Sequence, residues 1–382
     1  MTTATPDFVP GLQGVVAAET RLSSVDGQLG ELIIAGFPLE EIAGRATFEE
    51  MVYLLWYDAL PDAQQLADFQ QRLGAYRDLP GYTLALLRAA AEQQVPAMDA
   101  LRMAASTISL RTPGEPDDDQ RDALALVARF PTIVAAYWRL HNGEEPVAPR
   151  ADLSHTANYL YMLTSDVPTD EQVRAMETYL NTVMDHGLNA STFTARVIIS
   201  TESDMVSAVV GAVGALKGPL HGGAPGPALD MVFEIGDESR AEAYLREKLE
   251  RGDRLMGFGH RVYKVRDPRA DMLSQAAEKL YSADGDLQLY QLAKYVEDMA
   301  VTLLEEYKPG RKLQTNVEFY TALLLHGLNL PTDLFSPTFA ISRAAGWIAH
   351  AFEHQATGRL IRPQSVYTGE RNRQWVPLES RK

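Results

Sequence analysis

The sequence predicts an all-α, mainly helical protein with a short β-hairpin region near its N-terminus. Apolar residues recur at helical spacing over most of the chain after Thr47, and capping signals precede several of these segments. Strands and helices do not alternate along the chain, as they would in a doubly wound α/β fold.

The N-terminal region differs from the rest. Residues 14–39 are rich in Val, Thr, Leu and Ile, with Asp26-Gly27 between the short apolar runs. An Asp-Gly pair in this setting favours a hairpin turn, so we expect one or two short strands here.

Helical patterns follow one another after Thr47. Thr47 with Glu50, and Thr169 with Gln172, form capping boxes. Ser336-Pro337 is typical of an N-cap followed by a proline in the first turn. The helical segments that we expect are 47–58, 61–79, 83–94, 97–110, 120–141, 154–163, 169–186, 205–217, 227–233, 239–251, 268–280, 287–307, 317–328 and a last one from 336. Gly and Pro cluster at 217–227, which is either a hinge or an ordinary turn between helices.

Composition excludes several classes of protein. The chain has 382 residues, of which 46% are hydrophobic, enough for a large core. Its net charge of -16 disfavours nucleic acid or an anionic membrane surface as a partner. The absence of cysteine excludes disulfides, thiolate zinc sites and a cysteine nucleophile.

No targeting or membrane segment is visible in the sequence. Residues 1–10 contain neither a basic region nor an apolar run, and the stretch 206–216 is too short to span a bilayer. We therefore expect a soluble, cytoplasmic protein.

Three histidines lie beside glycine: His186 in MDHGLNAST, His221 in GPLHGGAP and His260 in GFGHRVYK. Glycine allows unusual backbone angles and close approach of a ligand, so these histidines are candidates for a site. A basic cluster follows His260, and Asp267-Pro268 predicts a helix N-terminus at Arg269 that favours an anion. A phosphate or carboxylate site is the favoured interpretation, and a solvated basic face is the alternative. The cluster consists of Arg254, Arg261, Lys264, Arg266 and Arg269.

Arg343 shares a helical face with Phe339 and Trp347, which lie four residues to either side. Such an arginine either pairs with a structural carboxylate or binds an anionic ligand, and the pattern leaves both open.

A zinc-peptidase pattern occurs near the C-terminus. His350, Glu353 and His354 match H-x-x-E-H, with both histidines on one helical face. A catalytic zinc needs a third protein ligand, and the polar tail offers only Glu370 and Glu379. We keep a helical zinc peptidase as a minor alternative.

Taken together, the motifs resemble the citrate synthase family. GPLHGGAP, MGFGHRVYKVRDPRA and NVEFYTALLLHGL occur in the family's order and spacing. GQLGELIIAGFPLEEIA resembles its N-terminal strand region, and SRAAGWIAHAFEH with RLIRPQSVYTG resembles its C-terminal helix and tail. The likeness thus covers nearly the whole chain, which is similar to the shorter bacterial and archaeal members.

The resemblance implies a two-domain fold and a homodimer. The large helical domain, which dimerises, would comprise 1–221 and 327–382, and the smaller inserted helical domain, 222–326, would close over the active site. At 382 residues, the chain is expected to lack room for the N-terminal extension of the longer, NADH-regulated members.

The resemblance also implies the chemistry, a condensation of acetyl-CoA with oxaloacetate. Glu318 matches the base, His221 the hydrogen-bond donor to the thioester oxygen, and His260 the residue that binds and protonates the oxaloacetate carbonyl. The groups matching those that hold the carboxylates are His186, Arg269, Arg343 and Arg362, the last contributed by the other subunit. Plausible contacts for the CoA phosphates are Arg261, Lys264 and Lys312. Acetyl-CoA would be a co-substrate, and no metal or permanently bound cofactor is implied.

The sequence departs from the family pattern at Glu318. The family usually has NVDFY where this chain has NVEFY, so the carboxylate here is longer by one methylene. Two alternatives remain besides the zinc peptidase: a 2-methylcitrate synthase that uses propionyl-CoA, and a non-catalytic CoA- or dicarboxylate-binding protein.

Overall fold

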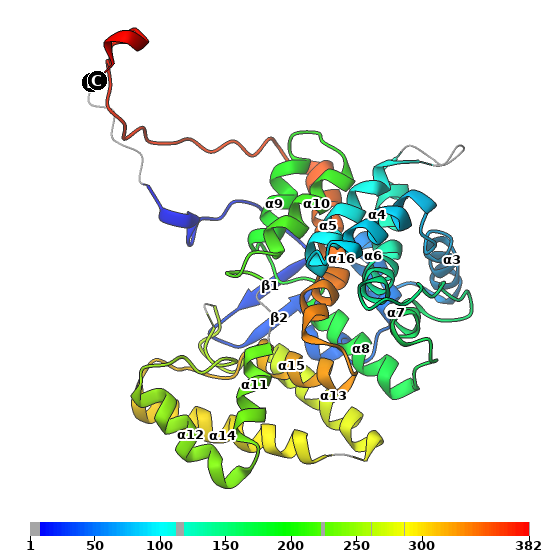
Figure 1. Cartoon of the computed structure of the whole chain (residues 1–382), viewed down its shortest axis with the longest axis vertical. Helices are drawn as coiled ribbons and strands as arrows, with labels where there is room; N and C mark the ends of the chain where they lie inside the picture. Colours follow the sequence, from blue (N-terminus) through cyan, green and yellow to red (C-terminus); the bar gives the residue numbers. More distant parts are fainter. Residues whose placement is uncertain (1–7, 112–117, 223–225, 261, 286, 382) are drawn as a thin grey trace.

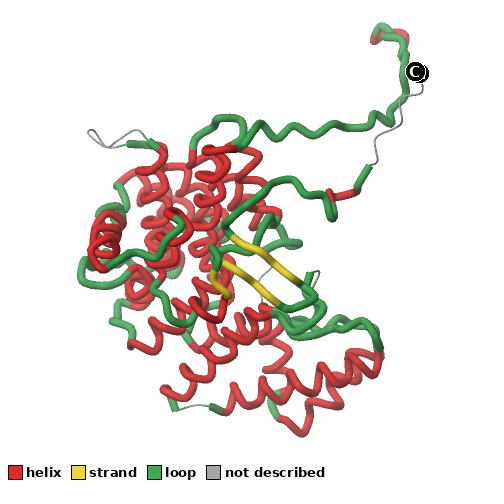
Figure 2. Tube along the Cα trace, turned by 180° about the vertical axis from the view of Figure 1, so that it is seen from behind, coloured by secondary structure: helices red, strands yellow, loops and turns green. Residues whose placement is uncertain are grey.

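The computed structural model describes residues 8–111, 118–222, 226–260, 262–285 and 287–381. Helices dominate these residues, and the only sheet among them is small, which confirms the predicted mainly helical class (Figure 2). The described strands pair only antiparallel, so no βαβ unit occurs in this part of the chain.

The sheet contains β1 (Ser23–Asp26), β2 (Glu31–Ile34) and β3 (Phe37–Pro38). In the β1–β2 hairpin, Ser23 lies opposite Ile34 and Asp26 opposite Glu31. Asp26 Oδ1 accepts hydrogen bonds from the N–H groups of Gln28 (2.8 Å) and Leu29 (2.9 Å), which stabilises the turn. The predicted hairpin is present, but our expectation of one or two strands was too low because a short third strand also pairs.

Most helices form one body, drawn above the remaining helices in Figure 1, with the strands at its side. They are α1 (Leu39–Ile42), α2 (Phe48–Tyr57), α3 (Ala63–Gly74), α4 (Gly81–Glu92), α5 (Ala97–Ser106), α6 (Asp119–His141), α7 (His155–Thr164), α8 (Asp170–Val183), α9 (Ala190–Ile199), α10 (Met205–Leu216) and α16 (Phe335–Thr357). Short 3-10 helices are η1 (Pro10–Leu12), η2 (Thr107–Ser109), η3 (Thr332–Leu334) and η4 (Leu378–Ser380).

A second, smaller group of helices lies beneath this body in the same view. It contains α11 (Gly226–Ile235), α12 (Glu238–Glu250), α13 (Pro268–Asp284), α14 (Gln288–Tyr307) and α15 (Val317–Gly327). Helices α13 and α15 pack against α8, and so join the two groups.

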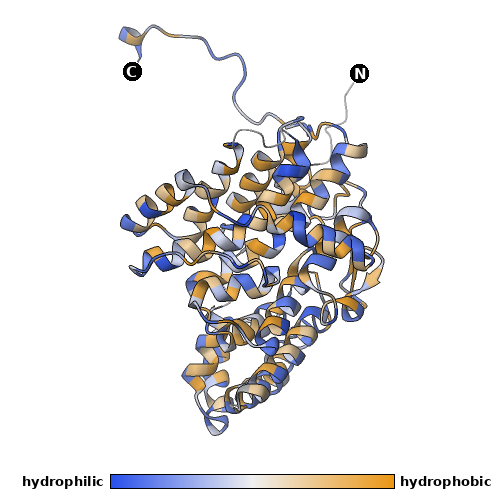
Figure 3. Ribbon diagram, turned by 90° about the vertical axis from the view of Figure 1, so that its right-hand side faces the viewer, coloured by the Kyte–Doolittle hydropathy of each residue, from blue (hydrophilic) through white to orange (hydrophobic). Residues whose placement is uncertain are grey.

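Helix α16 lies at the centre of the large group, where it contacts α2, α5, α6, α8, α9 and α10. Most of its side chains are buried, including Arg343, Trp347 and His350. Most helices carry both apolar and polar residues, as expected for helices with one face toward a core (Figure 3).

Helix α6 is, within the described residues, the one helix with the length and apolar composition to cross a membrane. In this fold 83% of that apolar stretch is buried.

The capping boxes at Thr47 and Thr169 are confirmed, as is the Asp267 cap of α13. The predicted cap at Ser336 is wrong. Helix α16 begins at Phe335 directly after η3, and Ser336 Oγ instead donates to the carbonyl of Gly222 at 2.7 Å. Helix α9 was not predicted.

Candidate active site

His186 lies in a short loop between α8 and α9. The helix predicted over 169–186 ends at Val183, which leaves His186 outside it. Gly187 has a φ of 62°, which glycine adopts without strain, and its N–H donates to Ser23 Oγ on β1 at 2.8 Å. The loop is therefore fixed to the sheet directly beside the histidine.

His260 lies on a segment, residues 257–260 and 262–264, that runs beside the residues preceding α15. We call this segment the strap. Gly259 N–H donates to the carbonyl of Gln314 (2.7 Å), and Asn316 binds the strap twice, through its N–H to Gly257 (2.9 Å) and its side-chain amide to Gly259 (2.9 Å). Gly257 has a φ of 86°, and a Cβ there would lie 2.9 Å from Phe319. Glycine is thus required where the strap meets α15.

The hydrogen bonds of His260 fix its tautomer. Nδ1 accepts from the backbone N–H groups of Val262 (3.0 Å) and Tyr263 (3.1 Å), so in the neutral ring the proton is on Nε2. Nε2 lies 3.5 Å from a terminal nitrogen of Arg269, which can only donate. Two donors side by side suit an acceptor oxygen of a ligand.

Arg269 is held in place by the cap of its own helix. Its Nε and a terminal nitrogen donate to the two oxygens of the buried Asp267 at 3.0 and 2.8 Å. Burial works against the charged guanidinium, but the carboxylate of Asp267 outweighs it and raises the pKa of Arg269.

Arg343 is buried on α16, and its Nε and one terminal nitrogen have no hydrogen-bond partner in the structure. Its guanidinium lies 4.8 Å from the ring centroid of Phe339. Burial lowers the pKa of Arg343 to about 10, with the charge of Asp185 opposing the shift and that of Arg269 adding to it. Burying a cation without a full set of hydrogen bonds lowers the stability of the protein, and binding of an anionic ligand would offset that loss.

His186 and His260 approach each other beside Tyr263. The two histidine rings are 6.0 Å apart between centroids, and His186 Nε2 lies 3.1 Å from the hydroxyl of Tyr263. Burial, with the charges of Arg269 and Arg343, holds the pKa of His186 well below its usual range. His186 is therefore neutral at pH 7.

His221 follows α10 and is bonded through Ser191 to α16. Its Nε2 lies 2.7 Å from Ser191 Oγ and accepts from the Ser191 N–H at 3.3 Å, while Trp347 Nε1 donates to the same Oγ at 3.1 Å. Since Nε2 accepts, the ring proton is on Nδ1. Burial, with the charge of Arg343, lowers the pKa of His221 to about 4, so the ring is a neutral donor at pH 7.

Glu318 lies in the first turn of α15, where Asn316 Oδ1 accepts its N–H at 2.9 Å. Burial raises the pKa of Glu318, although the charges of Arg269 and Arg254 oppose this. A carboxylate in a poorly hydrated site is a stronger base than one in water.

The structure thus brings together six of the residues that the sequence singled out, from both groups of helices. They are His186, His221, His260, Arg269, Glu318 and Arg343.

The remaining candidates lie elsewhere. Arg362 is exposed on the C-terminal tail, which extends away from the helical body (Figure 1). Lys264 and Lys312 are exposed on the strap and on the loop before α15, and Arg261 lies outside the described residues.

Several supporting residues were not predicted. Tyr263 lies inside the GFGHRVYK motif, and Asp185 and Ser191 lie inside MDHGLNAST, so these three could have been found there. Ser23 lies in no motif that the sequence analysis singled out.

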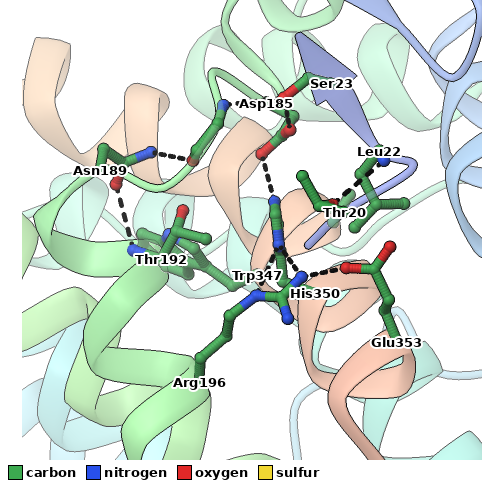
Figure 4. Close-up of polar contacts among 12 residues, drawn as sticks. Thr20, Leu22, Ser23, Asp185, Asn189, Thr192, Arg196, Trp347, His350 and Glu353 are labelled. Carbon is green, nitrogen blue, oxygen red and sulfur yellow. Dashed lines mark hydrogen bonds and ion pairs between the residues drawn. The ribbon is translucent and has the colours of Figure 1, made fainter. Parts of the chain in front are cut away.

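The residues of the H-x-x-E-H pattern are bonded to protein groups, as Figure 4 shows for His350 and Glu353. His350 Nδ1 accepts from Arg196 Nε at 2.9 Å, and its Nε2 lies 3.1 Å from Asp185 Oδ1. Glu353 pairs with Arg196 and accepts the N–H of Arg21, and His354 Nε2 donates to the carbonyl of Arg359. Both ring nitrogens of His350 thus contact protein groups, and Glu353 forms an ion pair with Arg196. The pattern residues form part of a network of protein contacts in this fold.

Known proteins resemble this chain over nearly its full length. A family model described as "Citrate synthase, C-terminal domain" matches residues 11–364. Citrate synthase from Haloferax volcanii is 40% identical over 97% of this chain and 98% of its own, and 2-methylcitrate synthase from Mycobacterium tuberculosis is 38% identical over 96% and 92%. The structure of citrate synthase from Thermoplasma acidophilum in a ternary complex with carboxymethyl coenzyme A and oxaloacetate matches this structure with a TM-score of 0.87 and 32% sequence identity. The match covers 99% of this chain and 100% of that one. The chain belongs to the citrate synthase family, whose members are acyltransferases.

Proposed function

We propose that this protein condenses acetyl-CoA with oxaloacetate and hydrolyses the resulting citryl-CoA to citrate and CoA. The observation that carries the proposal is the buried, incompletely bonded guanidinium of Arg343, set among Arg269, His186 and His260. Two cations and two histidine rings in one site suit a small dicarboxylate with an adjacent carbonyl.

Oxaloacetate would bind first to this cationic pocket. Arg269 and Arg343 bind its carboxylates, and neutral His186 donates a further hydrogen bond. His260 Nε2 and a terminal nitrogen of Arg269 lie 3.5 Å apart. Both can donate to one acceptor, which we assign as the 2-oxo carbonyl oxygen. Donors fixed before the reaction stabilise the developing alkoxide without reorganisation.

Glu318 and His221 would then activate acetyl-CoA. The methyl group is a very weak acid, so the Glu318 carboxylate removes its proton while the His221 Nδ1–H donates to the thioester oxygen. The resulting enol attacks the carbonyl carbon of oxaloacetate and returns its O–H proton to His221, while His260 protonates the alkoxide that forms. The proton that Glu318 took from the methyl group then restores His260. Water then attacks the thioester carbon and CoA leaves as the thiol.

The exposed cations near the strap would hold the phosphates of CoA. Lys264 and Lys312 are exposed, and Arg261 belongs to the same basic segment.

We also propose the two-domain, dimeric organisation of the family. The large domain would comprise 1–221 and 327–382, and the small domain, 222–326, would close over the substrates. Arg362, on the extended tail, would complete the site of the neighbouring subunit. If it does, mixing Arg362→Ala with His260→Ala protein should restore activity after subunit exchange, because one site in the hybrid would be intact. No recovery despite proven exchange would show that each subunit's site is self-contained. A cytoplasmic location remains a prediction, which cell fractionation tests.

The second candidate is a 2-methylcitrate synthase, because a relative of that name is 38% identical to this chain. Release of free CoA from acetyl-CoA and from propionyl-CoA, each with and without oxaloacetate, decides between them. A higher kcat/KM for acetyl-CoA supports citrate synthase, and the reverse supports the alternative. No oxaloacetate-dependent release from either would contradict both and support a non-catalytic binding protein.

A further inference from the structure

The loop that carries His186 is held by a chain of buried polar contacts that the reaction itself does not use (Figure 4). Ser23, on β1, forms hydrogen bonds with the residues directly before and after His186. Its Oγ donates to Asp185 Oδ2 and accepts the N–H of Gly187. Asp185, 1% exposed, then contacts His350 on α16.

The state of His350 follows from its partners. Arg196 can only donate, so Nδ1 of His350 is an acceptor and the ring proton is on Nε2, which donates to Asp185 Oδ1 at 3.1 Å. Glu353 pairs with Arg196 and so offsets its charge. The two contacts thus give His350 one defined orientation, with Nδ1 toward Arg196 and Nε2 toward Asp185.

The same helix approaches the loop directly at Gly346. A Cβ at this position would lie 2.3 Å from the carbonyl oxygen of Met184 and 3.4 Å from Asp185 Oδ1. Arg343, Gly346 and His350 are spaced three and four residues apart, so they share one face of α16. That face therefore presents the substrate-binding arginine and the support of the His186 loop together.

Asp185 also acts on Arg343 through its charge. Burial disfavours the ionised carboxyl, but contacts with His350 and Ser23 and the charge of Arg343 outweigh it and lower the pKa of Asp185. The carboxylate in turn offsets part of the burial cost of Arg343. Asp185 thus fixes the backbone beside His186 and supports the charge of Arg343.

We propose that His350 is a positioning residue, which acts through Asp185 to hold His186 and Arg343 in the arrangement that binds the carboxylates of the 2-oxo acid. The inference rests on the proposed function. It predicts that damage to the contacts of His350 weakens binding of oxaloacetate selectively, because the acetyl-CoA side of the site, Glu318 and His221, is supported by Asn316 and Ser191 instead.

Two substitutions at His350 separate positioning from simple packing. His350→Leu removes both contacts, whereas His350→Gln keeps an amide N–H for Asp185 and an amide oxygen for Arg196. Loss of the contacts should raise KM for oxaloacetate about 10-fold or more. KM for acetyl-CoA should change less than about twofold, and Gln should restore most of the loss.

Tyr159→Phe is the matched control. The buried hydroxyl of Tyr159 bonds Thr338 Oγ1, also on α16, at 2.7 Å, but does not contact the His186 loop in the described bonds. It should lower stability without changing KM for oxaloacetate. Ser23→Ala is the gentler second variant if Leu prevents folding, and it should raise the same KM about threefold.

Steady-state kinetics with both substrates, and calorimetric titration with oxaloacetate, are the measurements. The inference would be overturned if His350→Leu or Ser23→Ala had a KM for oxaloacetate equal to that of wild type within error. So would equal rises in both KM values, or a Gln variant no better than Leu. Absence of wild-type turnover would instead contradict the proposed function, and oxaloacetate titration of the variants would still test the positioning role. Absence of wild-type oxaloacetate binding as well would overturn both.

Discussion

Glu318 is the residue at which this chain departs from the usual pattern of its family. Its place in the first turn of α15 is fixed by the Asn316 cap and by Phe319, which packs where Gly257 has no side chain. The backbone that carries Glu318 is therefore held on both sides.

Glu318→Gln should lower kcat by about 10²–10⁴-fold, because the amide keeps the shape but cannot accept the methyl proton. Oxaloacetate affinity should change little, since the arginines and histidines that would bind it remain. Glu318→Asp is the matched comparison and should keep more activity than Gln, because it retains a carboxylate. Stopped-flow or steady-state kinetics give the answer. Near-normal turnover by the Gln protein would rule out Glu318 as the base.

The two buried arginines of the candidate site, Arg269 and Arg343, should respond in opposite ways to replacement by methionine. Arg269 is paired with Asp267, whereas Arg343 has unbonded nitrogens. Arg343→Met should stabilise the ligand-free protein by about 1–2 kcal/mol, and Arg269→Met should destabilise it by about 3–5 kcal/mol because Asp267 is left buried and unpaired. Both should abolish the thermal stabilisation that oxaloacetate gives to wild type. Thermal unfolding with and without oxaloacetate tests this, and a large loss of ligand-free stability in Arg343→Met would refute the account of that site.

At the scale of elements, the strap depends on the hairpin beneath it. The carbonyl of Gly27 accepts the N–H of Lys264 at 2.8 Å, and a Cβ on Gly27 would lie 2.2 Å from the carbonyl oxygen of Val262. The N-terminal hairpin therefore supports the segment that carries His260.

Gly27→Ala should displace the strap, because the new Cβ would collide with the backbone of Val262, which cannot move away without disturbing the neighbouring Lys264–Gly27 hydrogen bond. We expect a loss of about 1–3 kcal/mol in stability and a rise of KM for oxaloacetate. Gly74→Ala is the control: no atom lies within 4 Å of the added Cβ at the end of α3, so it should be neutral or slightly stabilising. An unchanged KM in Gly27→Ala would show that the hairpin does not set the position of His260.

Helix α8 contains Glu177, whose contribution to the stability of the fold depends on pH. Burial raises the pKa of Glu177 from 4.5 to about 7, despite its ion pair with Arg174 at 3.1 Å. The folded state holds this proton more tightly than the unfolded state, so its stabilising effect is present below pH 4.5 and is lost as the pH rises to about 7. Glu177→Gln should therefore be more stable than wild type at pH 8 by about 2–3 kcal/mol, and nearly equal to it at pH 4. Denaturant unfolding at both pH values checks this, and a difference that does not grow with pH would contradict it.

Local sequence signals predicted the helices and strands well where the same residues that give the signal also stabilise the element. The capping boxes at Thr47 and Thr169 place helix starts because their side chains bond the free N–H groups. Helix α9 was missed because ASTFTARVII is rich in Ser, Thr and β-branched residues, and burial against α10 and α16 outweighs that weak propensity. Ser336 has the residue type of a cap, but its hydroxyl bonds Gly222, a contact that no local pattern reveals.

At the scale of the whole molecule, the motifs predicted which residues lie together better than they predicted the contacts that hold those residues. His260 and Arg269 lie on one continuous motif, so their proximity was predictable. Asp185 and His350 are 165 residues apart, and only the fold brings them together. The sequence around Arg343 did not decide whether its partner is a buried carboxylate or an anionic ligand, because the same pattern suits both. In the structure two nitrogens of Arg343 have no hydrogen-bond partner.

The large and small groups of helices meet at the site, with His186, His221 and Arg343 from one and His260, Arg269 and Glu318 from the other. Substrate binding should draw them together, since the cations of both groups would share one dicarboxylate.

Product analysis by ¹³C NMR tests the central claim most directly. Incubation of wild-type protein with unlabelled oxaloacetate and acetyl-CoA labelled in the methyl group should yield citrate carrying the label in one methylene, with one free CoA per citrate. Labelled acetate, or CoA release that does not depend on oxaloacetate, would show that the site hydrolyses thioesters without forming the carbon–carbon bond and would contradict the account.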